Sequence, residues 1–200
     1  SSCSMMAQSI GSVLSGTTYP SDDPEMLAVE ADYAAKEAQL QAEIDNIENS
    51  HPGYDEYRYD LDMIGHDPHE LAAFLSAVLQ GYTRQSAQAE LARVFAAQYQ
   101  LTLTEEVEIR YRTETSTDPE TGEPTSEEVP YEYYILNVKL TSKPISAVAS
   151  ELLTPEQMEM YQVYRQTMGN KPLLFGGGSP DISNSEDLTG VQFVNGTRPG

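Results

Sequence analysis

Apolar and polar residues alternate along two long runs of the chain, and these runs predict the centre of the fold. Between 101 and 115, apolar side chains recur at every second position over most of the run, which is typical of a strand with one buried face. The run at 129–142 is apolar on both faces, so we expect it to be the central strand. A turn-rich segment at 118–124 joins them into a long hairpin. The apolar positions of the first run are Leu101, Leu103, Val107, Ile109 and Tyr111.

A third strand is predicted at 57–64, where Tyr57, Tyr59, Leu61 and Met63 alternate with charged residues. We expect it to join the hairpin in an antiparallel sheet of about three strands. A hairpin alone is only marginally stable in water, so helices must pack on this sheet and supply its core.

Helical periodicity then predicts four or more helices and hence an α+β fold, with helices at 24–49, 68–80, 84–99 and 155–168. The segment at 145–152 is expected to be a short helix or irregular. Positions 26, 33, 40 and 47 of the first helix repeat every seven residues, which leaves coiled-coil pairing open beside a helix that lies on its own domain. Its apolar side comprises Met26, Val29, Tyr33, Leu40, Ile44 and Ile47.

Capping signals mark the ends of these helices. Three starts place a polar N-cap residue directly before a proline, and two of them add the acid or amide of a capping box three residues later. Two glycines are expected to adopt the left-handed conformation at helix ends. These signals are the N-caps Asp23, Asp67 and Thr154, the box partners Glu70 and Gln157, and the glycines Gly81 and Gly169.

Composition along the chain predicts one α+β domain at 21–175, flanked by two terminal segments of different composition. The segment 1–20 is rich in small polar residues and is expected to be a flexible, membrane-proximal lead-in. The segment 176–200 begins with three glycines and has the composition of a linker. An ordered-looking pattern resumes at Val191 and Phe193, so we expect a further domain to follow and the sequence to be the middle of a longer protein.

Charge and cysteine content narrow the classes of function. Eleven basic and 32 acidic residues give a net charge of −21, which repels a nucleic-acid backbone and argues against direct DNA binding. No apolar run of about 18 residues could span a bilayer, so we expect any membrane anchor to precede Ser1. The single cysteine, Cys3, cannot form an internal disulfide. A lipid-modified Cys3 and a preceding membrane segment both remain open.

No catalytic, cofactor-binding or metal-ligating residue is assigned from the sequence. Asp60 and Asp62 resemble the start of a calcium loop, but the next ligand position holds Ile64 and the closing glutamate is missing. His66 and His69 flank a helix N-cap, and a metal site needs three or four converging ligands, so we expect neither to bind metal. We therefore expect no cofactor.

An acidic pair beside a tyrosine-rich face is the alternative that the residues leave open. Two carboxylates could act as in a glycosidase, and tyrosine rings could stack on sugars, although cross-strand aromatic packing is the commoner reason for tyrosines in a sheet. Among 32 acids some pair lies at glycosidase spacing by chance. The tyrosines concerned are Tyr54, Tyr57, Tyr59, Tyr111, Tyr131, Tyr133 and Tyr134.

Several stretches of the chain form a recognisable set. They are 19–21 with the following helix, 54–68, 110–115, 129–131, 156–172 and 185–200, and include Tyr54-Asp55-Glu56-Tyr57, Asp67-Pro68, Val129-Pro130-Tyr131 and Gly169-Asn170-Lys171-Pro172. Together these stretches resemble mobile-element proteins carried by integrative conjugative elements of Gram-positive bacteria, which are similar to cell-wall hydrolases with a C-terminal CHAP or NlpC-type domain. The resemblance covers nearly the whole chain.

This resemblance implies a non-catalytic, extracytoplasmic module, anchored at the cell surface, that positions a peptidoglycan hydrolase during conjugative transfer. The catalytic Cys and His of such proteins belong to the downstream domain, so no catalytic residue is expected here. The implied partners are that downstream hydrolase domain of the same chain, and also the cell wall or proteins of the conjugation machinery. The alternative expectation is a carbohydrate-binding or glycosidase domain.

Overall fold

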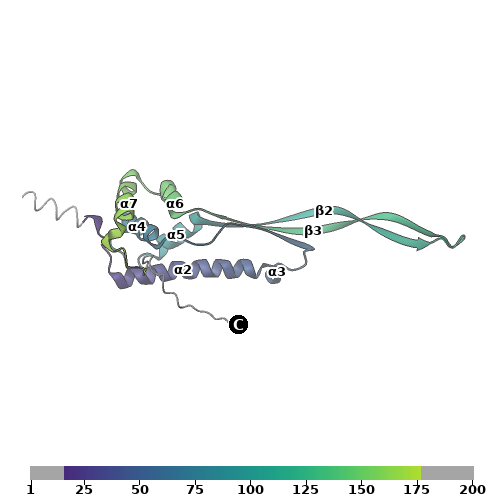
Figure 1. The fold of residues 1–200 in the computed structure, drawn as a ribbon, viewed down its shortest axis with the longest axis horizontal. Coiled ribbons are helices and arrows are strands. Elements are labelled where there is room, and N and C mark those ends of the chain that lie inside the picture. The colour runs from purple at the N-terminus through teal and green to yellow at the C-terminus, as the bar shows by residue number, and fades with distance from the viewer. Residues whose placement is uncertain (1–15, 177–200) are drawn as a thin grey trace, which may run out of the picture. The chain divides into compact units, whose positions relative to one another are not determined.

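The computed structural model describes residues 16–176 and has the α+β fold that the sequence predicts (Figure 1). The predicted lead-in up to residue 15 and the predicted linker from 177 lie outside the described residues. The elements are α2 (Asp23–Asp45), α3 (Ile47–Ser50), β1 (Glu56–Leu61), α4 (Pro68–Leu79), α5 (Gln88–Gln98), β2 (Tyr99–Thr117), β3 (Pro124–Ser142), α6 (Ile145–Leu152), α7 (Pro155–Thr167) and the 3-10 helix η1 (Met168–Asn170).

Contacts divide the described residues into two compact units, and the single domain at 21–175 stays a prediction. Among the described residues, the first unit takes 16–36, Gly65–Phe95 and 143–176. The second takes Glu37–Ile64 and Ala96–Ser142. Helices α2 and α5 each contribute residues to both units, so helical periodicity could not reveal the division.

The first unit is helical, and its centre is the contact of α4 with α6 and α7. The apolar face predicted for α4 is buried, including Leu71, Phe74 and Leu75. Helix α7 contributes Tyr161 and Tyr164. Tyr19, which lies inside the predicted lead-in, is only 2% exposed, and its N–H donates to the Gly169 carbonyl over 3.1 Å. Ordered packing therefore includes residue 19.

The helix ends confirm some of the predicted caps and correct others. Asp67 caps α4 by accepting the His69 N–H, but Glu70 does not close the predicted box, because its carboxylate pairs with Arg165 at 3.3 Å. Thr154 and Gln157 form both bonds of the capping box that opens α7.

Two further ends differ in detail from the prediction, and a third agrees with it. Helix α2 already includes Asp23, whose carboxylate pairs with Lys171 at 2.6 Å instead of capping the helix. At the end of α4 it is Gln80, with φ of 66°, and not Gly81, that takes positive φ, while its N–H bonds to Ser76. Gly169 has the expected positive φ of 60°.

The first predicted helix is interrupted at Asn46, so α2 and α3 replace one helix at 24–49. Its predicted apolar side is confirmed, because every one of its six residues is buried: Met26, Val29, Tyr33, Leu40, Ile44 and Ile47.

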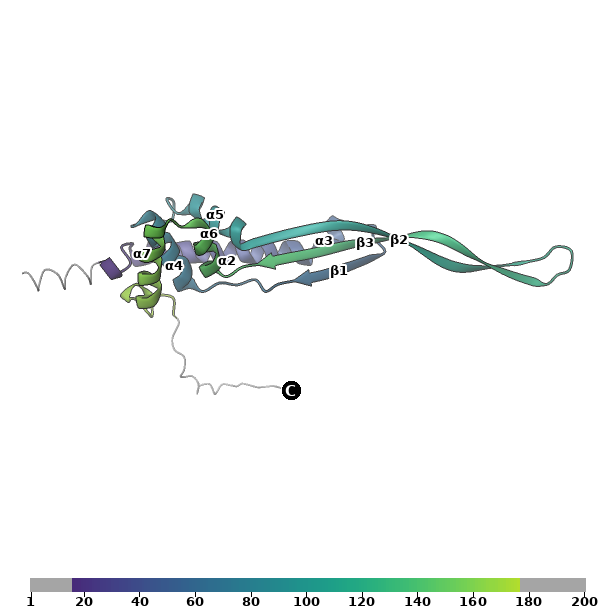
Figure 2. The same cartoon turned by 90° about the horizontal axis from the view of Figure 1, so that it is seen from above.

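The second unit is built on the predicted hairpin. β2 and β3 pair antiparallel from Tyr99 opposite Ser142 to Thr117 opposite Pro124, and Gly122 takes a φ of 75° in the turn (Figure 2). The strand order is β1-β3-β2, so β3 is the central strand, as predicted.

We expected an antiparallel sheet, and this expectation was wrong for β1. β1 runs parallel to β3, from Glu56 opposite Ile135 to Leu61 opposite Leu140. Alternation in a six-residue strand carries no sign of its direction, and parallel strands need only a long enough connection. Here the chain passes through α4, α5 and β2 before it reaches β3, which is ample for the return.

The core of this unit covers only the base of the hairpin. Beyond the base, the apolar side predicted to be half-buried is open to solvent: Val107 is 45%, Ile109 57% and Tyr111 63% exposed. The prediction was wrong there because alternation fixes which residues share a face and does not fix what covers that face. The core cluster consists of Ile47, Leu136 and Val138, with Tyr54, Tyr57, Leu101 and Leu103 packed against it.

Candidate functional site

The outer part of the hairpin is the feature that packing within the unit leaves unexplained. β1 pairs with β3 only over 135–140, so residues 107–117 of β2 and 124–134 of β3 continue as a two-stranded ribbon, which we call the arm. No side chain of the arm is buried. A two-stranded ribbon has no core of its own, so its exposed side chains are available for contacts with other molecules.

One face of the arm is apolar at its base. Directly opposed residues of an antiparallel pair share a face, which places Val107 beside Tyr134, Ile109 beside Glu132, and Tyr111 beside Pro130. Because nothing among residues 16–176 covers this strip, its apolar side chains remain in contact with water.

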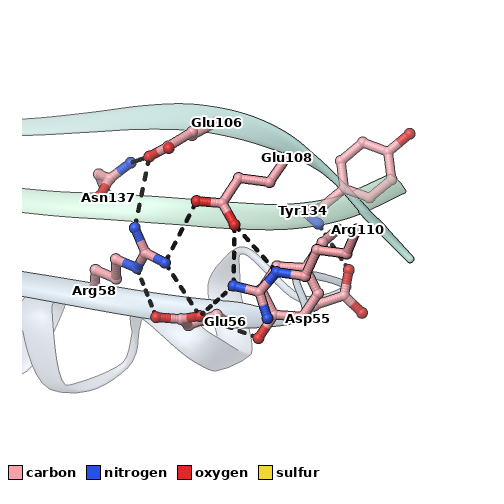
Figure 3. A network of polar contacts seen from close by, with 9 residues as sticks. Asp55, Glu56, Arg58, Glu106, Glu108, Arg110, Tyr134 and Asn137 are labelled. Carbon is pink, nitrogen blue, oxygen red and sulfur yellow. Dashed lines mark hydrogen bonds and ion pairs between the residues drawn. The ribbon is translucent and has the colours of Figure 1, made fainter. Parts of the chain in front are cut away.

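The opposite face carries a network of charged side chains that joins all three strands (Figure 3). Arg58 of β1 binds the Glu56 carboxylate at 2.6 Å and approaches Glu108 of β2 at 3.7 Å. Arg110 in turn lies 3.0 Å from Glu108 and 3.8 Å from Glu56. Two carboxylates thus alternate with two guanidinium groups. At the near end, the Asn137 amide of β3 donates to Glu106 over 2.9 Å.

Tyr133 completes this network from the central strand. Its hydroxyl donates to Glu56 over 3.0 Å, and the Arg110 guanidinium carbon lies 3.4 Å from the centre of its ring. The hydrogen bond from Arg58, followed by that from Tyr133, lowers the pKa of Glu56. The bond to Glu56 also raises the pKa of the Tyr133 hydroxyl.

Glu56 does not match the acid of a glycosidase pair. A glycosidase needs one carboxylic acid whose pKa is raised so that it can donate a proton. The pKa of Glu56 moves the other way, and the face of Tyr133 that could stack on a sugar lies under Arg110. Tyr131 has Arg112 over its ring at 5.4 Å. The network is suited to holding the three strands in register.

The remaining tyrosines do not assemble into one stacking platform. Tyr54 and Tyr57 pack edge to face in the core cluster, with ring centres 5.7 Å apart. Tyr111 and Tyr134 lie on the apolar face of the arm, and Tyr131 lies on the charged face.

Asp55 and Tyr134 fix which backbone groups the arm exposes. The Asp55 N–H donates to the Tyr134 carbonyl over 2.8 Å, and the Tyr134 N–H donates to the Asp55 carboxylate over 2.7 Å. The backbone groups of Tyr134 therefore face β1. Those of Val107, directly opposite, must face away from β3. Odd-numbered residues of β2 in the arm thus present their N–H and C=O groups at its outer edge.

The two histidines considered as ligands make separate contacts. His66 Nε2 lies 2.8 Å from the Glu30 carboxylate, and His69 Nδ1 lies 2.8 Å from the Tyr19 hydroxyl. The Asp62 carboxylate accepts the Ser142 N–H. Within residues 16–176 no three His, Cys, Asp or Glu side chains form a group that could hold a metal. That His66 and His69 bind no metal stays a prediction.

A shallow hollow in the first unit is already occupied by its own charges. Arg84 binds Asp32 at 2.7 Å, and its backbone N–H donates to Glu25 over 2.7 Å. The hydrogen bond from Arg84 lowers the pKa of Asp32. A ligand would have to displace these contacts, so the hollow is a weaker candidate than the arm. Its lining residues are Glu25, Asp32, Thr83, Arg84, Gln85 and Gln88.

Comparison with family models, with curated proteins and with solved structures found no match for the chain. Over the part of the chain that the structure describes, every helix is too short or too polar to cross a membrane. The link to conjugative elements therefore rests on the sequence resemblance alone.

The charged network was not predicted from the sequence, although its signal was present. Glu106, Glu108, Arg110 and Arg112 occupy successive positions of one face of a predicted strand. Two acids followed by two bases on one face indicate side chains that neutralise one another. β1 completes the network with Glu56 and Arg58. Its place beside β3 depends on the strand order, which the sequence does not reveal.

Proposed function

We propose that this chain is a non-catalytic interaction module that makes contacts through its arm. The observation that carries the proposal is that two segments of 11 residues each, opposite one another in the register, extend past the end of β1 without burying a side chain. Folding costs about 1–2 kcal/mol of backbone entropy per ordered residue, and the arm recovers little of it by burial. Contact with a partner would supply the missing burial.

In its cellular setting, we propose that the module is extracytoplasmic and positions a peptidoglycan hydrolase domain of the same protein in conjugative transfer. The support for this setting is the resemblance of the chain to mobile-element proteins, not the geometry. The acidic surface is compatible with it, since a net charge of −21 disfavours a role on nucleic acid.

Cell-wall digestion tests the non-catalytic part of the proposal. The purified chain is incubated with Gram-positive sacculi, and soluble muropeptides and glycan fragments are measured by liquid chromatography. We expect no release above buffer, with a known muramidase as the positive control. Release that disappears in the variant Glu56→Gln/Glu108→Gln, but persists in the matched variant Glu127→Gln/Glu128→Gln on the outer arm, would replace this proposal with the glycosidase alternative.

A further inference from the structure

In the arm, the outer edge of β2 is a row of backbone groups with which no strand of the described chain pairs. β2 has 19 residues and lies at the edge of the sheet, and no other strand within residues 16–176 pairs with that side. Long exposed edges are templates for pairing with another strand. Here the odd-numbered residues Val107, Ile109 and Tyr111 direct their N–H and C=O groups outward, as the Asp55–Tyr134 exchange requires.

Prolines protect the other edge of the arm and leave this one open. In β3 the even-numbered residues face outward, as Tyr134 does, and two of them, Pro124 and Pro130, have no N–H to offer. Proline on an edge strand blocks the addition of another strand. β2 contains no proline over its whole length. Any strand addition to the arm is therefore directed to β2.

The sequence of β2 is complementary to itself when two copies run antiparallel about Ile109. In that register Val107 lies opposite Tyr111 of the second copy, and Ile109 lies opposite Ile109. On the other face, acids meet bases on both sides of the centre: Glu108 lies opposite Arg110, and Glu106 lies opposite Arg112. Opposite charges and apolar pairs in directly opposed positions stabilise a sheet.

The same register satisfies the backbone. Residues that face the free edge have odd numbers, and pairing about Ile109 places odd-numbered residues opposite odd-numbered residues. Each such pair exchanges both of its hydrogen bonds, so residues 105–113 of two copies would form about ten. A shift of the register by one residue would place the outward-facing backbone groups of one copy opposite residues of the other copy whose backbone groups face inward. It would also place Glu108 opposite Ile109.

We propose that two copies of this chain associate by antiparallel pairing of their β2 edges, centred on Ile109, and so join two arms into one four-stranded sheet. This rests on the proposed role of the arm as a contact surface and is independent of any role at the cell wall. The apolar strips of the two arms become one continuous strip. At about 0.15 M salt the Debye length is about 8 Å, so opposed side chains still interact while the overall negative charge is screened.

Charge reversal tests the register in solution. Sedimentation velocity of the native chain, from micromolar to millimolar concentration in 0.15 M salt, should show a monomer–dimer equilibrium. The variant Arg112→Glu opposes two acids at each end of the paired stretch, and Glu106→Arg opposes two bases. Each should weaken self-association at least about tenfold. Far-ultraviolet circular dichroism confirms that each variant remains folded.

Mixing these two variants is the decisive step. One brings only acids and the other only bases to positions 106 and 112, so their mixture should recover association as a heterodimer at native strength. The control Glu127→Arg changes the net charge as Glu106→Arg does, but lies on β3, and should self-associate like the native chain. A native chain that stays monomeric throughout overturns the proposal. So does a dimer that neither reversal weakens, or a mixture that gains nothing over the separate variants.

Discussion

Asp55 and Tyr134 exchange two hydrogen bonds at the point where β1 ends its contact with the central strand, one from each backbone N–H. Past this point β3 loses one of its two neighbours, and the sheet narrows from three strands to two. The exchange also fixes the direction of every backbone group in the arm. A local hydrogen-bond pair thereby determines which residues of the arm direct their backbone groups toward a partner.

Acidification should weaken the charged network through Glu56. Its pKa is lowered from the ordinary value of 4.5 by hydrogen bonds from Arg58 and Tyr133, so ionised Glu56 stabilises the folded state above that pH. The contribution is lost as the pH falls from about 4.5 through the lower folded-state pKa. Urea unfolding at pH 7 and pH 3 should show a smaller loss of stability in Glu56→Gln than in the native chain.

The control for this pH experiment is Glu127→Gln, which removes an exposed acid of the arm. It should lose as much stability between pH 7 and pH 3 as the native chain does. Equal losses in all three proteins would show that Glu56 is not stabilised by its partners in solution.

Gly169→Ala should destabilise the first unit strongly. A Cβ at this position would lie 2.2 Å from Cγ of the buried Tyr19 ring, and the φ of 60° is strained for alanine. Gly176→Ala is a matched control in the same unit, because its φ is 73° but no described atom lies within 4 Å of the added Cβ. Thermal unfolding should show a loss of about 1 kcal/mol for the control and at least about 3 kcal/mol for Gly169→Ala. Equal losses would mean that Tyr19 does not pack on Gly169.

Removal of the Tyr161 hydroxyl and removal of the Tyr99 hydroxyl should have different effects on the stability of the fold. Tyr161 is buried without a hydrogen-bond partner for its hydroxyl among the described residues, and burial raises its pKa to about 12. Tyr161→Phe should therefore leave stability unchanged or raise it by up to about 1 kcal/mol. The Tyr99 hydroxyl donates to the buried Glu37 carboxylate, so Tyr99→Phe should cost about 1–3 kcal/mol. Urea unfolding compares the two; a larger loss for Tyr161→Phe would contradict this assignment.

The elements of this fold could be predicted because their signals are local. The buried side of α2 follows from a single periodicity, and the capping box at Thr154 and Gln157 lies within four consecutive residues. The central place of β3 followed from its apolar residues on both faces. Each of these features depends on residues that lie close together in the sequence. A sequence pattern contains this local information.

What the sequence could not reveal depends on partners far apart in the chain. The direction of β1 is set by the path through α4, α5 and β2, and the exposure of Ile109 is set by where the core cluster around Ile47 ends. At the end of α4 the positive φ belongs to Gln80 and not to Gly81. Residue propensity does not locate a helix end to within one residue. The candidate site lies among these long-range features, so it emerged only from the structure.

The central claim is that the arm makes contacts on which the function of the protein depends, and a shortened arm tests it most directly. In the hydrolase-bearing protein that we propose, residues 109–132 are replaced by Asn-Gly, which joins the opposed pair Glu108 and Tyr133 through a two-residue turn and keeps the Asp55–Tyr134 exchange. Cleavage of intact sacculi is then compared with cleavage of a soluble wall peptide. We predict that wall cleavage falls at least about tenfold while peptide cleavage and the unfolding midpoint are unchanged. Wall cleavage at the rate of the intact protein would contradict the claim. A reading frame without a hydrolase domain would overturn only the proposed cell-wall setting, and failure of self-association alone would overturn only the pairing of two copies.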